Sequence, residues 1–280
     1  MSILGTLTDT MNVYLPQPHA SLINGILYGE QLSRHTPFYE QVHRVGLLHI
    51  VVISGTNITL LGGLIHACTL KIVGRKLSLI LTILSIIGFV FLVGADPPIS
   101  RAAIMGCIAL IGKLYGRKTY TLYVLLLSGC IVALVKWEWM SSVSFHLSFF
   151  ATLGIILCAR KKKESHGSKG TLEKISRFAA IKEYIASDLY TSLSAQVFTV
   201  PIIFWKFGEI SVIAPFSNIG VSCIVGPLMV IGACASILGS IHPWLGKPCA
   251  YISFGLLQYM ITVIRVLAHI PYIFFSFHAG

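Results

Sequence analysis

Long apolar stretches separated by short polar connections dominate the chain. A helix needs about 20 mostly apolar residues to cross the hydrocarbon core of a membrane. Stretches of this kind predict membrane spans near residues 46–70, 77–95, 99–116, 120–136, 142–159, 189–207, 211–240 and 249–272. The pattern therefore predicts an all-α, polytopic integral membrane bundle with roughly seven to nine membrane segments.

Two segments depart from a simple series of spans. Residues 20–29 are apolar but too short to cross a membrane, so we expect an interfacial or re-entrant helix within an external N-terminal segment, 1–45. Residues 211–240 are too long for one straight helix and contain Pro215 and Pro227, which predicts a broken helix or two half-spans. Residues 46–280 form the predicted transmembrane domain.

The connections differ in charge, and the difference predicts an orientation. Lys and Arg cluster in residues 71–76, 113–118 and 160–188, whereas the turns at 96–98 and 137–139 carry little positive charge. Cytoplasmic loops of membrane proteins are enriched in Lys and Arg. We therefore expect the three basic connections in the cytoplasm and both termini outside. The run RKKKESHGSKG at 160–170 is either such a topology signal or a contact to anionic lipid or nucleic acid.

Composition agrees with a membrane protein. Of the 280 residues, 55% are hydrophobic and 11% charged, whereas soluble domains carry about 25% charged residues. A water-soluble globular protein and a disordered chain are thereby excluded. The net charge of +11 is interpreted mainly as the basic content of cytoplasmic loops. The seven cysteines lie in or beside apolar stretches without a CxxC pair, and we interpret them as small buried hydrophobes.

Polar residues inside the apolar stretches are the candidate functional residues, because a polar group in a bilayer is costly unless it faces protein or water. The run ISGTNIT at 53–59 contains Asn57 near mid-span and follows His49. Its side chains either join helices by hydrogen bonds or line a cavity. Arg101 opens the 99–116 stretch. Its side chain either snorkels to the interface or offers a positive charge to an anion at the outer mouth of a cavity.

Further polar residues lie on other predicted spans. His146 is near the outer end of its helix, and a lone histidine there is more often structural than a ligand. Gln196 belongs to a polar stripe at helical spacing, and Asn218 precedes Ser222 by one helical turn. Together these stripes predict a shared hydrophilic interior. Ala102 and Gly106 instead form a small-residue face for close helix packing.

Several catalytic signatures are missing from the sequence. It contains no GxxxxGK[ST] phosphate loop, no HExxH zinc site and no GxSxG nucleophile elbow. We therefore expect neither enzymatic activity nor a cofactor or resident metal.

Five elements occur in an order that resembles one protein family. They are LPQPHASLINGILYGEQ at 15–31, GLLHIVVISGTNITLL at 46–61, PPISRAAIMG at 97–106, SFHLSFFATLGI at 144–155 and AQVFTVPIIFWKFGEISVIAPFSNI at 195–219. Together they resemble the transmembrane competence domain of ComEC-type DNA-uptake proteins. Within these elements the resemblance implies structural motif positions at Ser54, Gly55, Ala102, Gly106, Pro201 and Gly208.

The resemblance implies a channel component that imports single-stranded DNA across the cytoplasmic membrane during natural transformation. The strand would pass polar groups at His49, Asn57, Arg101, His146, Gln196 and Asn218. An external DNA receptor or nuclease and a cytoplasmic DNA motor would act in trans. The sequence leaves open whether the chain forms a homo-oligomer. Relatives commonly carry an OB-like and a metallo-β-lactamase-like domain that this sequence lacks, so we expect a stand-alone or truncated version.

Two other functions stay open at the level of sequence. The first is a secondary transporter for a small anion, with Arg101 as its charged anchor. The second is an intramembrane hydrolase that uses His49 or His146.

Overall fold

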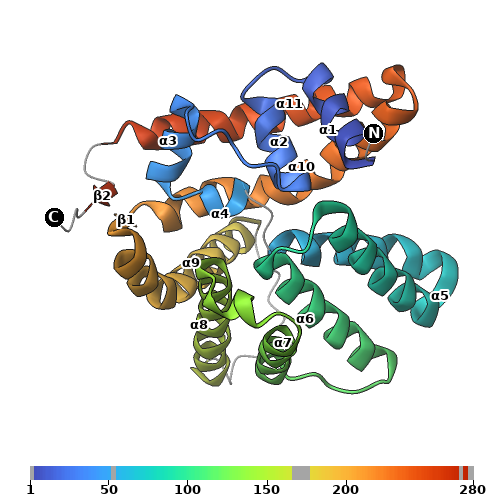
Figure 1. Cartoon of the computed structure of the whole chain (residues 1–280), viewed down its shortest axis with the longest axis vertical. Coiled ribbons are helices and arrows are strands. Elements are labelled where there is room, and N and C mark those ends of the chain that lie inside the picture. Colours follow the sequence, from blue (N-terminus) through green and yellow to red (C-terminus); the bar gives the residue numbers. More distant parts are fainter. Residues whose placement is uncertain (1–2, 52–54, 166–176, 271–273, 277–280) are drawn as a thin grey trace.

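The computed structural model describes residues 3–51, 55–165, 177–270 and 274–276. Apart from one short ribbon of two strands, the described chain is helical, as the apolar stretches predict (Figure 1). In chain order the elements are α1 (Ile3–Tyr14), α2 (His19–Tyr28), α3 (Pro37–Val45), α4 (Leu48–Val51), α5 (Gly55–Val93), α6 (Pro97–Leu114), α7 (Thr121–Val135), the 3-10 helix η1 (Trp137–Ser141), α8 (Val143–Ser165), α9 (Arg177–Phe207), β1 (Glu209–Ser211), α10 (Ala214–Ile241), α11 (Pro243–Ala268) and β2 (Phe274–Ser276).

The N-terminal helices share one apolar core with α10 and α11. Figure 1 shows α1, α2 and α3 lying along this C-terminal helix pair. Every residue of α2 except Ser21 is buried, and Leu22 packs in the same cluster as Leu228 and Leu257. The short segment predicted at 20–29 is therefore a helix enclosed by protein. Its depth relative to a membrane stays a prediction.

α5 is a helical hairpin that turns back at Gly74, where φ is +76°. Its two limbs meet through Ser78, whose hydroxyl lies 2.8 Å from His66 Nδ1 and 2.7 Å from Thr69 Oγ1. The limbs correspond to the spans predicted at 46–70 and 77–95. The predicted start at residue 46 is wrong, because Gly46 caps α3 in the left-handed conformation and the separate helix α4 follows it.

The next four apolar stretches form α6, α7, α8 and α9, and their ends agree with the prediction to within a few residues except at the end of α8 and the start of α9. The structure differs most at the basic connection predicted at 160–188. α8 continues to Ser165 and α9 begins at Arg177, so this connection is helical at both of its ends.

The segment at 211–240 does not break. α10 is one helix of 28 residues, so the predicted broken helix is wrong. Pro215 lies in its first turn, where a proline removes no hydrogen bond that the helix needs. Pro227 lies inside the helix, which continues past it to Ile241.

The small ribbon was not predicted by hydropathy. Gly208, with φ +65°, follows α9 and turns the chain into β1. β1 pairs antiparallel with β2, so that Glu209 lies opposite Ser276. The ribbon thereby ties the end of α9 to the segment that follows α11.

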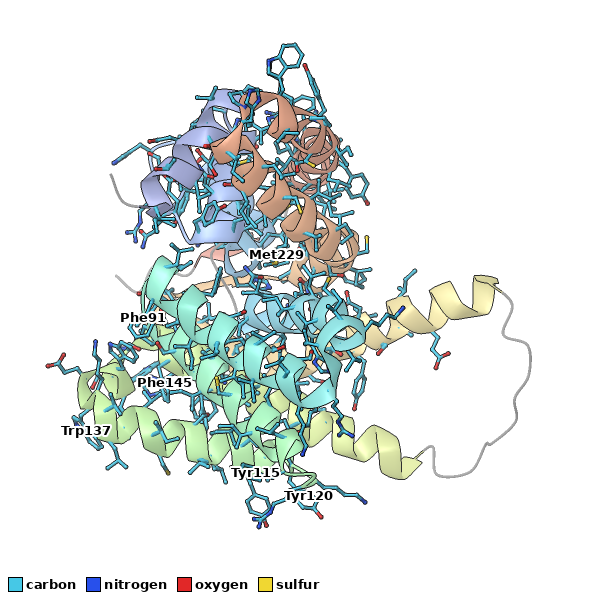
Figure 2. The ribbon with its side chains drawn as sticks, turned by 90° about the vertical axis from the view of Figure 1, so that its right-hand side faces the viewer. Phe91, Tyr115, Tyr120, Trp137, Phe145 and Met229 are labelled. Atoms are coloured by element: carbon cyan, nitrogen blue, oxygen red, sulfur yellow. The ribbon has the colours of Figure 1, made fainter. Side chains whose placement is uncertain are left out.

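Among the described residues, four helical segments are long and apolar enough to cross a membrane: Asn57–Val93, Pro97–Leu114, Ala214–Ile241 and Pro243–Ala268. The first includes both limbs of the α5 hairpin. α7 and residues 143–158 of α8 form shorter apolar helices. Large side chains such as Phe91 and Trp137 project from the surface (Figure 2). Together with the four candidate spans, such an extended apolar surface fits a membrane protein.

Candidate functional site

Arg101 is buried in the second turn of α6, with 4% of its surface exposed. Its guanidinium donates a 2.8 Å hydrogen bond to Thr152 Oγ1 and another hydrogen bond to Ser148 Oγ, both on α8. Among the described residues these two hydroxyls are its partners, and Arg101 Nε has none. We call Arg101, Ser148 and Thr152 the Arg101 site.

The chemistry of this site favours an anion. A buried cation is costly unless an opposite charge compensates it. A guanidinium carries five N–H donors in a planar fork, and Ser148 and Thr152 accept only two of them. The remaining donors match the oxygen atoms of a phosphate or carboxylate. The side chain also lies between helices, which is not the snorkelling geometry that the sequence left open.

Small residues bring α6 close to α5 beside the Arg101 site. A Cβ placed on Gly55 would lie 3.0 Å from Ala102 Cβ, and one on Gly106 would lie 3.7 Å from Ile86 Cδ1. The predicted small-residue face therefore packs against α5, while Arg101 on a neighbouring face reaches α8. Ser54, which the same motif includes, lies outside the described residues.

A second polar group joins α4, α9 and α10. Asn218 Nδ2 donates a 3.0 Å hydrogen bond to Ser192 Oγ, and its amide also lies beside the His49 imidazole. One helical turn away, Ser222 donates a 2.7 Å hydrogen bond to Asp188 Oδ2. We call these five residues the α9–α10 polar cluster. It contains two of the predicted residues, His49 and Asn218.

The other predicted residues lie elsewhere. Asn57 is 1% exposed and donates a 2.8 Å hydrogen bond to the Ile26 carbonyl, so its amide joins α5 to α2. His146 is half-buried, with Nδ1 2.8 Å from the Ser142 carbonyl. Gln196 is also half-buried, one turn beyond Ser192 on α9. The structure thus divides the predicted set among several helix contacts.

Two predicted structural residues mark the far end of α9. Pro201 lies inside this helix, and Gly208 ends it, with its N–H bonded to the Phe204 carbonyl at 2.9 Å. Their positions fit a structural role at the point where the chain leaves α9 and enters β1.

Sequence reasoning missed three hydrogen-bond acceptors. Ser148 and Thr152 accept from Arg101, and Asp188 accepts from Ser222. Ser148 and Thr152 are spaced four residues apart in an apolar stretch, which was the available signal. Asp188 borders its apolar stretch, so hydropathy counted it with the preceding loop.

These features define a helical membrane protein with hydrogen-bonded polar groups buried between its helices. Its sequence also matches a known family model over residues 26–279. The chain belongs to that family, which is described as "Competence protein".

Two curated relatives were found. "ComE operon protein 3" of Bacillus subtilis (strain 168) is 24% identical over 228 residues, which cover 81% of this chain and 27% of that protein. An "Uncharacterized protein" of Aquifex aeolicus (strain VF5) is 30% identical over 201 residues, which cover 68% of this chain and 47% of that protein. The chain thus spans less than half the length of either relative. No solved structure matches it.

Proposed function

We propose that this chain forms a membrane-embedded part of the path by which single-stranded DNA enters the cell during competence. The family match and the relation to a ComE operon protein support this proposal. The observation that carries it is the Arg101 site, a buried guanidinium whose described partners are two neutral hydroxyls. The phosphodiester backbone is an anion that such a guanidinium can bind while bases of any sequence pass.

The chain would cross the cytoplasmic membrane several times. Counting the limbs of α5 separately, the helices fit roughly seven to nine membrane segments, of which some are short. The basic connections at 71–76, 113–118 and 160–188 would lie in the cytoplasm and both termini outside.

Hydrogen-bonding side chains would line the path that the DNA backbone follows. Arg101 would bind phosphate. His146 would lie nearby, because it belongs to α8, the helix that carries the two hydroxyl partners of Arg101. Further along, Gln196 and the α9–α10 polar cluster would supply amide, imidazole and hydroxyl groups. Because the amide of Asn57 bonds α2, its role would be to fix the helices beside the path.

The work of transport would come from other proteins. An inside-negative membrane potential opposes the entry of a phosphate by roughly 2.3 kcal/mol per charge per 100 mV. The sequence has no phosphate-binding loop for nucleotide hydrolysis. A cytoplasmic motor would therefore pull the strand, and an external receptor or nuclease would deliver it. We propose no catalytic role and no resident cofactor for this chain, and a homo-oligomer is compatible with the proposal.

The Arg101 site also favours a second function, a secondary transporter for a small anion. Both functions use the same positive charge, so they differ in the solute that the chain moves. The hydrolase alternative has no comparable support.

Arg101 substitutions test the proposal in competent cells whose own copy of the gene is replaced. Arg101→Gln keeps hydrogen bonding without the charge, and Arg101→Lys keeps the charge without the planar fork. We expect a fall in transformation of about ten-fold or more for Gln and an intermediate fall for Lys. Arg117→Gln is the matched control, because Arg117 is an exposed arginine just after α6.

Membrane abundance is measured for each variant by immunoblotting. Normal transformation by an abundant Arg101→Gln protein contradicts the proposal. If the Arg101→Gln protein does not accumulate in the membrane, transformation by an Arg101→Lys protein of normal abundance tests the proposal in its place. Chain-dependent uptake of a labelled small anion, with transformation unaffected by deletion of the gene, supports the second function instead.

A further inference from the structure

Four cations gather at one end of α5 and α6. Lys71, Arg75 and Lys76 flank the point where the α5 hairpin turns back, and Lys113 lies in the last turn of α6. All four side chains are exposed. Figure 1 shows α5 at the edge of the molecule with α6 beside it. We call these four residues the α5–α6 basic end.

The packing of the two helices places these cations together. A Cβ on Gly106 of α6 would lie 3.7 Å from Ile86 Cδ1 in the second limb of α5. The short connection at 94–96 makes this limb and α6 run antiparallel. At a rise of 1.5 Å per residue, Lys76 lies about 15 Å and Lys113 about 10 Å from that contact in the same direction. Two basic connections that are distant in the sequence thus meet at one end of one helix pair.

No negative charge on these helices compensates the cations. Neither α5 nor α6 contains Asp or Glu. The nearest acid to α6 in the sequence is Asp96, which precedes its first turn and so lies at its opposite end. A cluster of about four to eight Lys or Arg residues beside a membrane helix is typical of a surface that binds anionic lipid.

Apolar side chains at the same end favour lipid over nucleic acid as the partner. Ile72, next to Lys71, is 81% exposed, and Leu77, next to Lys76, is exposed as well. Tyr115 projects just beyond the end of α6 (Figure 2), as tyrosines do at membrane interfaces. A DNA strand would pair with the cations but leave the apolar groups in water. A phospholipid provides both a phosphate and acyl chains.

We propose that the α5–α6 basic end binds the headgroups of anionic phospholipids. Lys71, Lys76 and Lys113 would contact the phosphate oxygens, while Ile72 and Leu77 would pack against the acyl chains. A lipid bound in this way would join α5 to α6 and stabilise the hairpin. This binding is separate from the proposed path of DNA and does not depend on it.

The test measures lipid binding by the full chain in a neutral detergent. Fluorescence anisotropy gives the affinity for phosphatidylglycerol, which is anionic, and for phosphatidylcholine, which has no net charge, with the same labelled acyl chain. The test variant combines Lys71→Gln, Lys76→Gln and Lys113→Gln. If this variant cannot be isolated in folded form, Lys76→Gln alone is measured in its place.

The matched control removes the same charge from lysines that do not form one surface. It combines Lys136→Gln, Lys206→Gln and Lys247→Gln, and these three exposed lysines lie after α7, on α9 and on α11. A third variant replaces Lys71, Lys76 and Lys113 by arginine, which keeps the positive charge.

We expect the unmodified chain to prefer phosphatidylglycerol by about ten-fold or more, since each basic residue near an anionic surface contributes about five-fold in affinity. The test variant should lose most of this preference, and Lys76→Gln alone should lose about five-fold. The control and arginine variants should keep the preference, and binding of phosphatidylcholine should be the same for every protein.

Other results overturn the inference. Equal binding of both lipids by the unmodified chain would show no anionic lipid site. Equal losses in the test and control variants would show an effect of net charge alone. A fluorescent thymidine oligonucleotide is titrated in parallel. If the test variant loses the oligonucleotide but keeps phosphatidylglycerol, the basic end binds DNA and not lipid, and the proposed function stands.

Discussion

The guanidinium of Arg101 donates a 2.8 Å hydrogen bond to the hydroxyl of Thr152, 51 residues further along the chain. This bond joins α6 to α8 at a point where the structure buries a positive charge. Thr152 also donates to the Ser148 carbonyl one turn earlier. Its hydroxyl thus fixes the direction of the guanidinium relative to α8.

Thr152→Val should therefore weaken both the fold and the function. Valine keeps the shape of threonine but removes the acceptor, and a hydrogen bond to a charged group contributes about 1.5–3 kcal/mol. We expect a loss of this order in unfolding free energy in detergent, together with reduced transformation. Thr191→Val is the control, because Thr191 makes the same bond to a carbonyl one turn earlier but is exposed. Equal effects of the two substitutions would contradict the role of Thr152.

The α9–α10 polar cluster predicts energetic coupling between two helices. Asn218→Ala and Ser192→Ala each remove one partner of the same 3.0 Å hydrogen bond. A double-mutant cycle on unfolding free energy should give a coupling of about 0.5–3 kcal/mol. The cycle of Asn218→Ala with Thr191→Ala should be additive, because Thr191 bonds its own helix. An additive result for the first cycle would show that the bond contributes nothing to stability.

Close packing of α8 against α9 predicts a strong effect at Gly154. A Cβ added there would clash with the Ser194 carbonyl and lie 2.7 Å from Phe198. Gly154→Ala should therefore destabilise the chain by about 1–3 kcal/mol, the usual range for an overpacked contact. Gly88→Ala is the control, because a Cβ at Gly88 would have nothing within 4 Å. It should be neutral or stabilise α5 by up to about 1 kcal/mol. Thermal unfolding in detergent compares the two variants.

Orientation can be tested by cysteine labelling in a background without the seven native cysteines. Ser168→Cys, in the basic connection at 160–188, should react with an impermeant maleimide only after the membrane is opened. Glu138→Cys, in the turn beside Trp137, should react in intact cells. The reverse pattern would invert the proposed topology.

The apolar stretches predicted most helices to within a few residues, but not all of their ends. Hydropathy placed α6 and α7 well. It missed the start of the first span at Gly55, because a capping glycine at residue 46 and a short helix interrupt an apolar run without changing its mean hydropathy. It also predicted a break in α10, where the first proline lies in a turn that tolerates it.

The candidate site was predicted only in part. Arg101 was identified because a charge in an apolar stretch violates hydropathy. Its partners Ser148 and Thr152 were not, since hydroxyl residues are common in membrane helices and often bond their own backbone. Asn57 and Asn218 were expected to share one interior, yet the structure places the first against α2 and the second against α9. Helical spacing indicates on which face of its own helix a residue lies, but it does not indicate which other helix packs against that face.

The sequence by itself determined that this is a helical membrane protein, because each helix in lipid must satisfy its backbone hydrogen bonds within its own apolar segment. It also determined which polar and charged residues lie inside the apolar stretches. Only the tertiary structure decided that Arg101 faces α8, that α5 folds back at Gly74, and that Lys76 and Lys113 lie at one end of the same helix pair. These relations depend on how the faces of distant helices fit together, and that fit is a property of the packed bundle and not of any one segment.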